Sequence, residues 1–445
     1  MCRRVRVLWV GIGVFGVTPV LAVLGWVVLN SRDIAATDVS DLVPEAATTP
    51  YQDSAYRCLK TAVDLLKWPE DIRLESLPEE WDDALIGNVL SRNGEVLTSL
   101  EQALACPGYR ADNGAGPDSW LRLSLFVAQK AAYERRIGLS DVACESSCCL
   151  LRLGAWITSC PRSLAEWFDG AMALRLGLEG VERLLRGAPL GEADLTMLLE
   201  RLNQAEISDR GLAEAFKMEF QSVSEAIDAC ALRHPGRSLL NVYRFQPNRT
   251  RERFAGFYRR MIQNVSLLPA DVRLPHFATS RVDGIHGYLL SLGPNRQGRV
   301  LGEIVTPQLA RTDTCFETRW QIQSHLNGLR LVAACRIYEL RHGRLPATLD
   351  ALVPQLLGEV PRDPYDGKPF RYVRDRALVY SIGGDLKDAG GVVERAAEAS
   401  AVRPIPEPSE DPNWPEYPSS VPRSSLLAVP SRVGDLVYSL RPETQ

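Results

Sequence analysis

An uncharged apolar run near the start of the chain constrains its architecture most. Residues 7–29, VLWVGIGVFGVTPVLAVLGWVVL, hold no charged side chain and directly follow three arginines, Arg3, Arg4 and Arg6. At about 1.5 Å per residue, a helix of this length spans a hydrocarbon core of roughly 30 Å. The run therefore predicts an N-terminal transmembrane helix, with residues 1–30 forming a cytoplasmic tip and a membrane anchor.

The charges on either side of the run predict its orientation. Basic residues precede it and Asp33, Asp38 and Asp41 follow it, which favours a cytoplasmic N-terminus. A cleaved secretory signal is the alternative, but its apolar region is normally about 7–15 residues long and ends in a small-x-small site. We expect a single-pass protein of the cytoplasmic membrane that contacts the bilayer through residues 7–29. The bulk of the chain then lies outside the cytoplasm.

Composition bounds the class of protein and its partners. The 445 residues include 51 Lys and Arg against 55 Asp and Glu, a net charge of -4. This balance gives no electrostatic reason to expect nucleic acid as a partner. Nine of the ten cysteines follow the apolar run, an odd number that cannot all pair, and their spacing favours buried thiols over a metal site. A Cys58–Cys106 or Cys144–Cys160 disulfide remains open.

Residues 31–50 predict a tether, and residues 51–235 show helical periodicity. The predicted helices cover residues 56–66, 83–104 with a break near Asn93 and Gly94, 120–136, 141–157, 163–186, 192–205 and 211–232. Ser140 is the expected N-cap of the 141–157 helix. Paired helices with short connections predict an α-hairpin array of the tetratricopeptide type, with a plain irregular bundle as the alternative.

Residues 236–307 predict an irregular connecting region. Within it, NRTRERFAGFYRR at 248–260 interleaves arginines with aromatic side chains. That pattern superficially suggests RNA or lipid binding. We favour a helix that turns Phe254, Phe257 and Met261 inward and leaves its arginines in water.

Residues 308–394 predict a small α+β unit. A helix over 308–342 carries the apolar stripe Ile322, Leu326, Leu329, Ala333, Ile337 and Leu340. Gly343 ends this helix, and a short second helix is expected over 345–356. Residues 370–373 and 378–381 alternate as two strands of a hairpin, which must lie on the helix because a lone hairpin is marginal in water. The Pro-rich residues 395–445 predict a disordered tail.

The C-terminal segments resemble a known family. GRLPATLDALVPQLLGEVPRDPYDGKPFRYV, followed by LVYSIGGDLKDAGG, is similar to the C-terminal half of the major pseudopilin of type II secretion systems. The resemblance implies a long helix that carries a β-hairpin. Pseudopilins have a glutamate five residues into the apolar segment and a peptidase site before it, and residues 11–29 contain neither. We therefore do not expect this chain to polymerise as a pilin.

The whole arrangement also resembles a family of membrane-anchored bacterial proteins whose function is unknown. That family shares the anchor, a helical region with an A-L-A-x-P segment, here residues 103–107, and the C-terminal motif. The resemblance implies no activity.

The loop after the second predicted strand carries the one candidate metal site. In the pseudopilin family this loop resembles a calcium site, and the matching residues here are Asp385 and Asp388. Calcium takes about six to eight oxygen ligands, so two carboxylates would need carbonyls from the glycine loop as well. Lys387 lies between them, and the family's further aspartate is missing. The alternative is a turn in which each aspartate caps backbone amides.

No catalytic motif is visible. The five histidines lie in different segments, and the sequence has no H-E-x-x-H, no G-x-S-x-G and no phosphate loop. We expect a mainly α, extracytoplasmic interaction or scaffold protein of the cell envelope that binds other envelope proteins, with no catalytic residue, no cofactor other than calcium and no small-molecule substrate. The alternatives are an envelope hydrolase acting on glycan or peptide, and an accessory component of a secretion or pilus-like machine.

Overall fold

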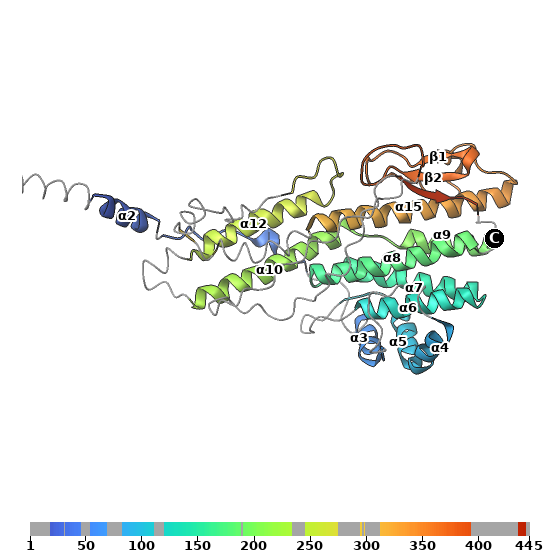
Figure 1. Ribbon diagram of the computed structural model, residues 1–445, viewed down its shortest axis with the longest axis horizontal. Helices are drawn as coiled ribbons and strands as arrows, with labels where there is room; N and C mark the ends of the chain where they lie inside the picture. Colours follow the sequence, from blue (N-terminus) through green and yellow to red (C-terminus); the bar gives the residue numbers. More distant parts are fainter. Residues whose placement is uncertain are drawn as a thin grey trace, which may run out of the picture. The chain divides into compact units, whose positions relative to one another are not determined.

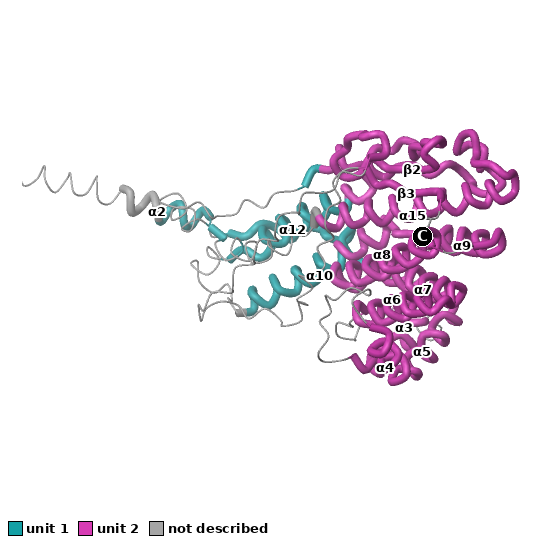
Figure 2. Tube along the Cα trace, turned by 45° about the vertical axis from the view of Figure 1, so that its right-hand side comes forward, with its two compact units in different colours: residues 1–44, 217–262, 273–312 teal, residues 45–216, 263–272, 313–445 magenta. Residues whose placement is uncertain are grey.

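The computed structural model describes residues 18–30, 32–45, 54–68, 82–110, 120–187, 190–233, 245–274, 294–295, 298, 312–392 and 435–441. These residues are mainly helical and include one three-stranded antiparallel sheet (Figure 1). The chain divides into two compact units (Figure 2). Unit 1 holds residues 1–44, 217–262 and 273–312, and unit 2 holds residues 45–216, 263–272 and 313–445.

The predicted anchor is described only in its second half, where α2 covers Thr18–Leu29. Residues 7–17 of the predicted span lie outside the described residues. Among the helices that the structure describes, none is both long enough and apolar enough to cross a bilayer.

In unit 1, part of the segment predicted to be a tether is held on helix α12 (Pro247–Asn264). The carboxylate of Asp33 accepts the backbone N–H groups of Asn248 at 2.8 Å and Arg249 at 3.1 Å, in the first turn of that helix. Further along, Arg259 donates to both carboxylate oxygens of Asp41, each at 2.7 Å. A bidentate pair restrains the relative orientation of its two side chains as well as neutralising their charges. Residues 32–43 are therefore held along α12 by contacts at both ends.

Helix α12 confirms the inward face that the sequence predicts, whereas two of its arginines, Arg251 and Arg259, form ion pairs with Asp228 and Asp41 instead of lying free in water. Phe254, Phe257 and Met261 are buried as predicted, and Tyr258 is buried beside them. The ring of Tyr258 packs edge-on against Phe220, with their centroids 5.9 Å apart. The aromatic side chains of this helix therefore belong to the core of unit 1.

Unit 2 opens with a run of helices whose bounds agree with the prediction to within a few residues. They are α3 (Tyr56–Leu65), α4 (Asp83–Arg92), α5 (Gly94–Ala105), α6 (Trp120–Arg136), α7 (Ser140–Ser159), α8 (Leu164–Gly187) and α9 (Glu192–Gln204). The next helix, α10 (Asp209–Arg233), begins in unit 2 and belongs to unit 1 from residue 217 on. The break at Asn93 is confirmed, because its buried side chain bonds to the backbone of Lys67 and Val89. The prediction for Ser140 is wrong. It is the first helical residue, and Leu139 takes the N-cap and accepts the N–H of Ala143.

Helices α7 and α8 pack unusually closely. A Cβ on Gly154 would lie 2.5 Å from the backbone nitrogen of Leu174, and one on Gly170 would lie 2.9 Å from the backbone nitrogen of Thr158. Helix α6 packs on both α7 and α8, and α7 also touches α9. The glycines let the two backbones approach to distances that any side chain would prevent.

Helix α15 (Thr312–His342) is buried on more than its predicted stripe. Five of the six stripe residues are buried, but Leu340 is 55% exposed, because it lies in the last turn of the helix. Leu331, Val332 and Cys335, which lie off the stripe, are buried as well. Basic side chains of α15 bind acceptors on its neighbours. Arg319 pairs with Asp209, His325 with Glu182, Arg330 with the carbonyls of Leu202 and Ala205, Arg336 with the carbonyl of Leu185, and Arg341 with Glu192.

Beyond α15 the chain turns and forms the sheet. Gly343 has a φ of 70°, the left-handed conformation predicted at the helix end. The helix predicted over 345–356 is wrong. Only the 3-10 turn Leu349–Leu352 forms, since Pro354 has no N–H with which to continue a helix. The predicted hairpin is confirmed as β1 (Arg371–Val373) and β2 (Leu378–Ser381), and Phe370 and Leu378 are buried.

A third strand, β3 (Leu436–Ser439), completes the sheet in the order β1-β2-β3. It pairs antiparallel with β2, with Leu378 opposite Ser439 and Ser381 opposite Leu436. This strand lies within the segment 395–445 for which the sequence predicts disorder, so that prediction is wrong for residues 436–439. The sheet lies beside α15 (Figure 1).

Candidate functional site

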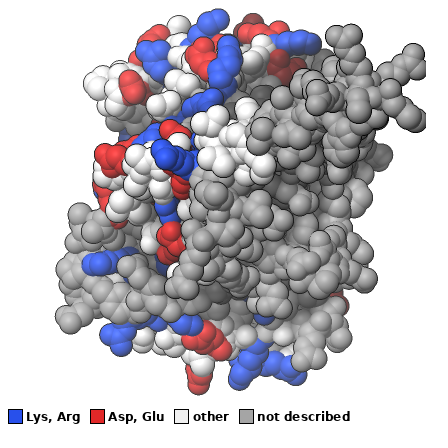
Figure 3. All heavy atoms as spheres, turned by 90° about the vertical axis from the view of Figure 1, so that its left-hand side faces the viewer, with Lys and Arg blue, Asp and Glu red and all other residues white. Residues whose placement is uncertain are grey.

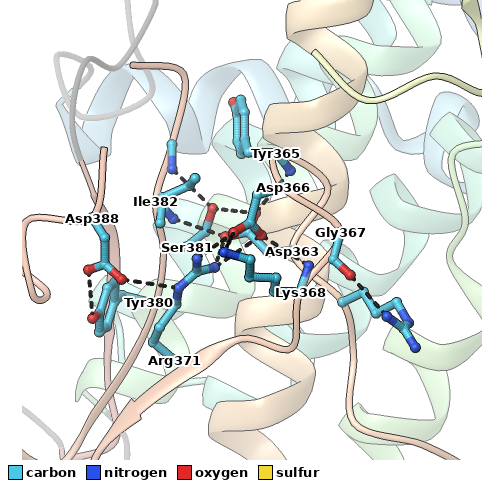
Figure 4. Close-up of polar contacts among 12 residues, drawn as sticks. Asp363, Tyr365, Asp366, Gly367, Lys368, Arg371, Tyr380, Ser381, Ile382 and Asp388 are labelled. Atoms are coloured by element: carbon cyan, nitrogen blue, oxygen red, sulfur yellow. Dashed lines mark hydrogen bonds and ion pairs between the residues drawn. The ribbon is translucent and has the colours of Figure 1, made fainter. Parts of the chain in front are cut away.

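Three carboxylates converge on one guanidinium at the turn that leads into the hairpin (Figure 4). Arg371 on β1 donates to Asp363 at 2.8 Å and to Asp366 at 2.6 Å, and its Nε lies 3.5 Å from Asp388. Asp363 and Asp366 belong to the turn before β1, whereas Asp388 follows β2. The cation in the middle of this acidic cluster is therefore a side chain of the protein itself.

Asp363 is the buried centre of the cluster, and its side chain is fully shielded from solvent. Besides Arg371, it accepts the hydroxyl of Ser381 at 2.8 Å and the backbone N–H groups of Tyr365 at 3.0 Å and Ile382 at 2.9 Å. Burial raises the pKa of Asp363, and these donors act in the opposite direction. One carboxylate thus joins the turn before the hairpin to the end of its second strand.

The two predicted calcium ligands lie in separate turns. Asp385 accepts the N–H of Lys387 at 3.1 Å, which is the capping contact of the alternative interpretation. Asp388 accepts the N–H of Gly390 at 3.0 Å and the hydroxyl of Tyr380 at 2.9 Å. The N–H of Gly390 lowers the pKa of Asp388. Among the described residues, no group of three or more His, Cys, Asp or Glu side chains is arranged to hold a metal ion.

The loop that carries Asp388 instead receives an aspartate from the far end of the chain. Asp435, immediately before β3, is 4% exposed and accepts the N–H of Ala389 at 3.3 Å and that of Gly391 at 2.7 Å. Arg376 donates to the carbonyls of Gly390 and Gly391 in the same loop. The loop predicted to coordinate a cation therefore presents backbone donors to an anion.

Tyr438 anchors the middle of β3 on α15. A Cβ on Gly328 would lie 2.4 Å from the Tyr438 ring, so only glycine leaves room for that ring. The ring of His325 stacks on it with centroids 5.7 Å apart, and Phe370 lies 6.5 Å away. At the other end, Leu440 is 1% exposed and donates its N–H to the carbonyl of Ala377 at 2.9 Å.

Residues 435–440 thus occupy a complete recognition site for an extended segment, which we call the strand site. Its parts are the amides of residues 389 and 391, the edge of β2, and the surface of α15 at Gly328 and His325. Backbone hydrogen bonds to β2 hold the segment, and the close fit of the Tyr438 ring against Gly328 and His325 selects its side chain. This is the general way in which proteins bind peptides by strand addition.

A second buried carboxylate lies in the helical part of unit 2. Glu166 on α8 accepts the indole N–H of Trp120 at 2.7 Å, the hydroxyl of Tyr109 at 3.2 Å and the backbone N–H of Arg162 at 2.6 Å. The guanidinium of Arg162 also binds it, and the ring of Tyr56 packs on Trp120. This network ties the start of α6 to the start of α8.

Asp169 lies one turn beyond Glu166. Burial, together with the charge of Glu166, raises the pKa of Asp169 to about 7. The backbone amides of Leu121 and Trp120 at the start of α6 oppose that rise. A carboxyl group that titrates near neutral pH beside a second carboxylate is a feature that active sites also use.

Charge on the described surface is mixed. On the face drawn in Figure 3, the coloured Lys and Arg side chains lie among Asp and Glu side chains, and the described residues of this face form no extended patch of one sign. Comparison with protein-family models, curated proteins and solved structures finds no match to this chain.

Sequence reasoning missed three of the residues that organise these sites. Asp363 was visible only as part of a proline-aspartate turn, Glu166 as a residue within a helix, and Asp435 as part of a tail. Each acts through partners that are distant in sequence. The one local signal was the pattern D-L-V-Y-S-L at 435–440, a short apolar run with Val and Tyr that is typical of a strand.

Proposed function

We propose that this chain is a membrane-anchored interaction protein of the cell envelope, which holds other proteins and performs no catalysis. The observation that carries the proposal is the strand site, where a segment distant in sequence is bound through backbone pairing, an aspartate contact and an aromatic contact. A site of this design recognises polypeptide rather than a small molecule.

The use of the buried charges supports the same proposal. Asp363 and Glu166 each accept several hydrogen bonds from groups that position neighbouring elements. A general base needs a lone pair that faces substrate, and a carboxylate surrounded by structural donors offers none without rearrangement. We infer that both act in folding.

The location in the envelope rests on the sequence. The uncharged run 7–29 and the arginines before it favour an anchor with its N-terminus in the cytoplasm. The partners of such a protein are then envelope proteins, and the strand site faces the extracytoplasmic side.

The proposal is tested by crosslinking in intact cells, followed by purification in detergent. The wild-type chain is compared with a Leu436→Asp/Leu440→Asp double variant, whose buried apolar anchors are replaced by charges. Discrete protein partners that are retained by the wild type and changed in the double variant support the proposal. A purified chain that captures no partner, yet cleaves envelope glycan or peptide, contradicts it.

One observation favours the rival function of an envelope hydrolase. Glu166 and Asp169 are two neighbouring carboxyl groups, and the pKa of Asp169 is about 7. If this pair were catalytic, Asp169→Asn would abolish turnover of an envelope polymer while leaving the protein folded. The third function, an accessory component of a secretion machine, rests on the pseudopilin resemblance. It predicts that the crosslinked partners are secretion components.

A further inference from the structure

Residues 435, 438 and 440 supply three of the contacts that hold the segment in the strand site. Asp435 binds the loop at 389–391, Tyr438 packs on α15, and Leu440 donates to Ala377. Every one of these partners belongs to β2, to its flanking loops or to α15. The site would therefore bind the same six residues equally well from any chain that presents them.

The segment and the strand that it pairs with carry the same four residues. β2 reads Leu-Val-Tyr-Ser at 378–381, and β3 reads Leu-Val-Tyr-Ser at 436–439. They pair antiparallel with Val379 opposite Tyr438 and Tyr380 opposite Val437. One copy of the repeated sequence therefore pairs with the other, in a register that is symmetric about the centre of the pair.

The length of chain before β3 allows the segment to reach another molecule. Residues 393–434 separate the segment from the end of the β2 loop in the sequence. A stretch of that length spans on the order of 100 Å when extended. The number of connecting residues alone therefore does not restrict the segment to the site on its own chain.

We propose that the strand site binds residues 435–440 of a second copy of this chain, so that copies held on one membrane are linked by exchange of their C-terminal strands. This inference rests on the proposed function and names its partner. An exchanged strand makes the same hydrogen bonds and the same packing in its new site as it made in its own chain, so the balance between the two states depends on local concentration. Anchoring in a membrane raises that concentration.

A complementation experiment with two full-length variants in detergent tests the proposal. Gly328→Val blocks the site, because a Cβ there already meets the Tyr438 ring at 2.4 Å, and this variant keeps an intact segment. Leu436→Asp/Leu440→Asp places charges at the two buried apolar anchors of the segment, so the segment no longer binds and the site is left unoccupied. Each variant is measured alone and in a mixture by light scattering after size exclusion, with one of them labelled.

The expected result is a one-to-one complex in the mixture, with both variants monomeric when alone. A peptide of residues 435–441 should compete, and the same peptide with Asp in place of Tyr438 should compete at least about tenfold less well, as expected when one aromatic anchor is lost. Absence of a complex at about 100 µM of each variant overturns the proposal. That result would place the Kd above this concentration. So does self-association of the segment-defective variant alone, which would mean that bare β2 edges pair with each other.

A second measurement distinguishes an absent interaction from a segment-defective variant that has failed to fold. Its melting temperature is recorded with and without the 435–441 peptide, which should raise it by several degrees if the open site accepts a strand in trans. Absence of any rise, together with no complex, counts against the proposal. If other envelope proteins nevertheless crosslink to the wild type, the proposed interaction function is supported and only the proposed strand exchange is contradicted.

Discussion

Arg371 shows at the scale of a single residue how this chain uses charge. A calcium site at Asp385 and Asp388 is predicted from the sequence, and the structure places a guanidinium among Asp363, Asp366 and Asp388. Burial opposes ionisation of Asp366, but its hydrogen bonds with Arg371 prevail and lower its pKa. The guanidinium of Arg371 thus holds the turn before β1 and the loop after β2 together, as a bound metal ion does in other proteins.

Removing that cation should make the cluster depend on metal. Arg371→Ala leaves the buried Asp363 without its ionic partner, a loss that typically costs about 3–5 kcal/mol. We expect millimolar calcium to restore part of the lost melting temperature in this variant and to leave the wild type unchanged. Arg374→Ala, at an exposed position on the same hairpin, is the control and should change little. A calcium-dependent rise in the wild type would instead favour the predicted site at Asp385 and Asp388.

Asp169 gives the chain a pH dependence with a definite sign. Its folded-state pKa of about 7 lies above the unfolded value of about 3.9, so the folded protein binds more protons between these values. Stability from this group is therefore greatest at low pH and declines as pH rises through 7. We expect Asp169→Asn to stabilise the protein at pH 8 by on the order of 1–3 kcal/mol and to have little effect at pH 4. An equal effect at both pH values in thermal melts would contradict this.

At the scale of elements, the contact of α7 with α8 depends on glycine. Gly154→Ala places a methyl group 2.5 Å from a backbone nitrogen, where no rotamer relieves the overlap. We expect a loss of about 1–3 kcal/mol in chemical denaturation. Gly87→Ala on α4 is the matched control. A Cβ there meets nothing within 4 Å, so better helix propensity should raise stability by about 0.5–1 kcal/mol. Equal effects at the two positions would show that the close contact is absent.

Elements were predictable where their signals are local, and were missed where they are not. Apolar periodicity and turn residues were enough for α6, whose bounds Trp120–Arg136 match the prediction. They were also enough for the hairpin. The strand β3 was missed because four residues after a Pro-rich stretch carry little local information, and its stability comes from β2 and α15. The partners of Asp363 and Glu166 were equally hidden, since a hydrogen bond between distant segments leaves no spacing pattern.

At the scale of the whole molecule, the uncharged run 7–29 predicts where the protein works. A reporter fused after Gln445 should be active only outside the cytoplasm, because the arginines before the run favour a cytoplasmic N-terminus. Replacing Arg3, Arg4 and Arg6 with Glu should weaken that orientation and serves as the control. Cytoplasmic activity of the wild-type fusion would show that the predicted extracytoplasmic location is wrong. The proposal that the partners are envelope proteins would then be wrong as well.

The central claim is that residues 435–440 are bound in the strand site, and hydrogen–deuterium exchange tests it most directly. In the wild type, the backbone amide of Leu440, which donates to Ala377, and the β3 amides that face β2 should exchange far more slowly than those of an unstructured peptide, because they are hydrogen-bonded. Gly328→Val should remove this protection while that of α7 and α8 persists. Exchange of residues 436–440 at the rate of a free peptide in the wild type would contradict the account.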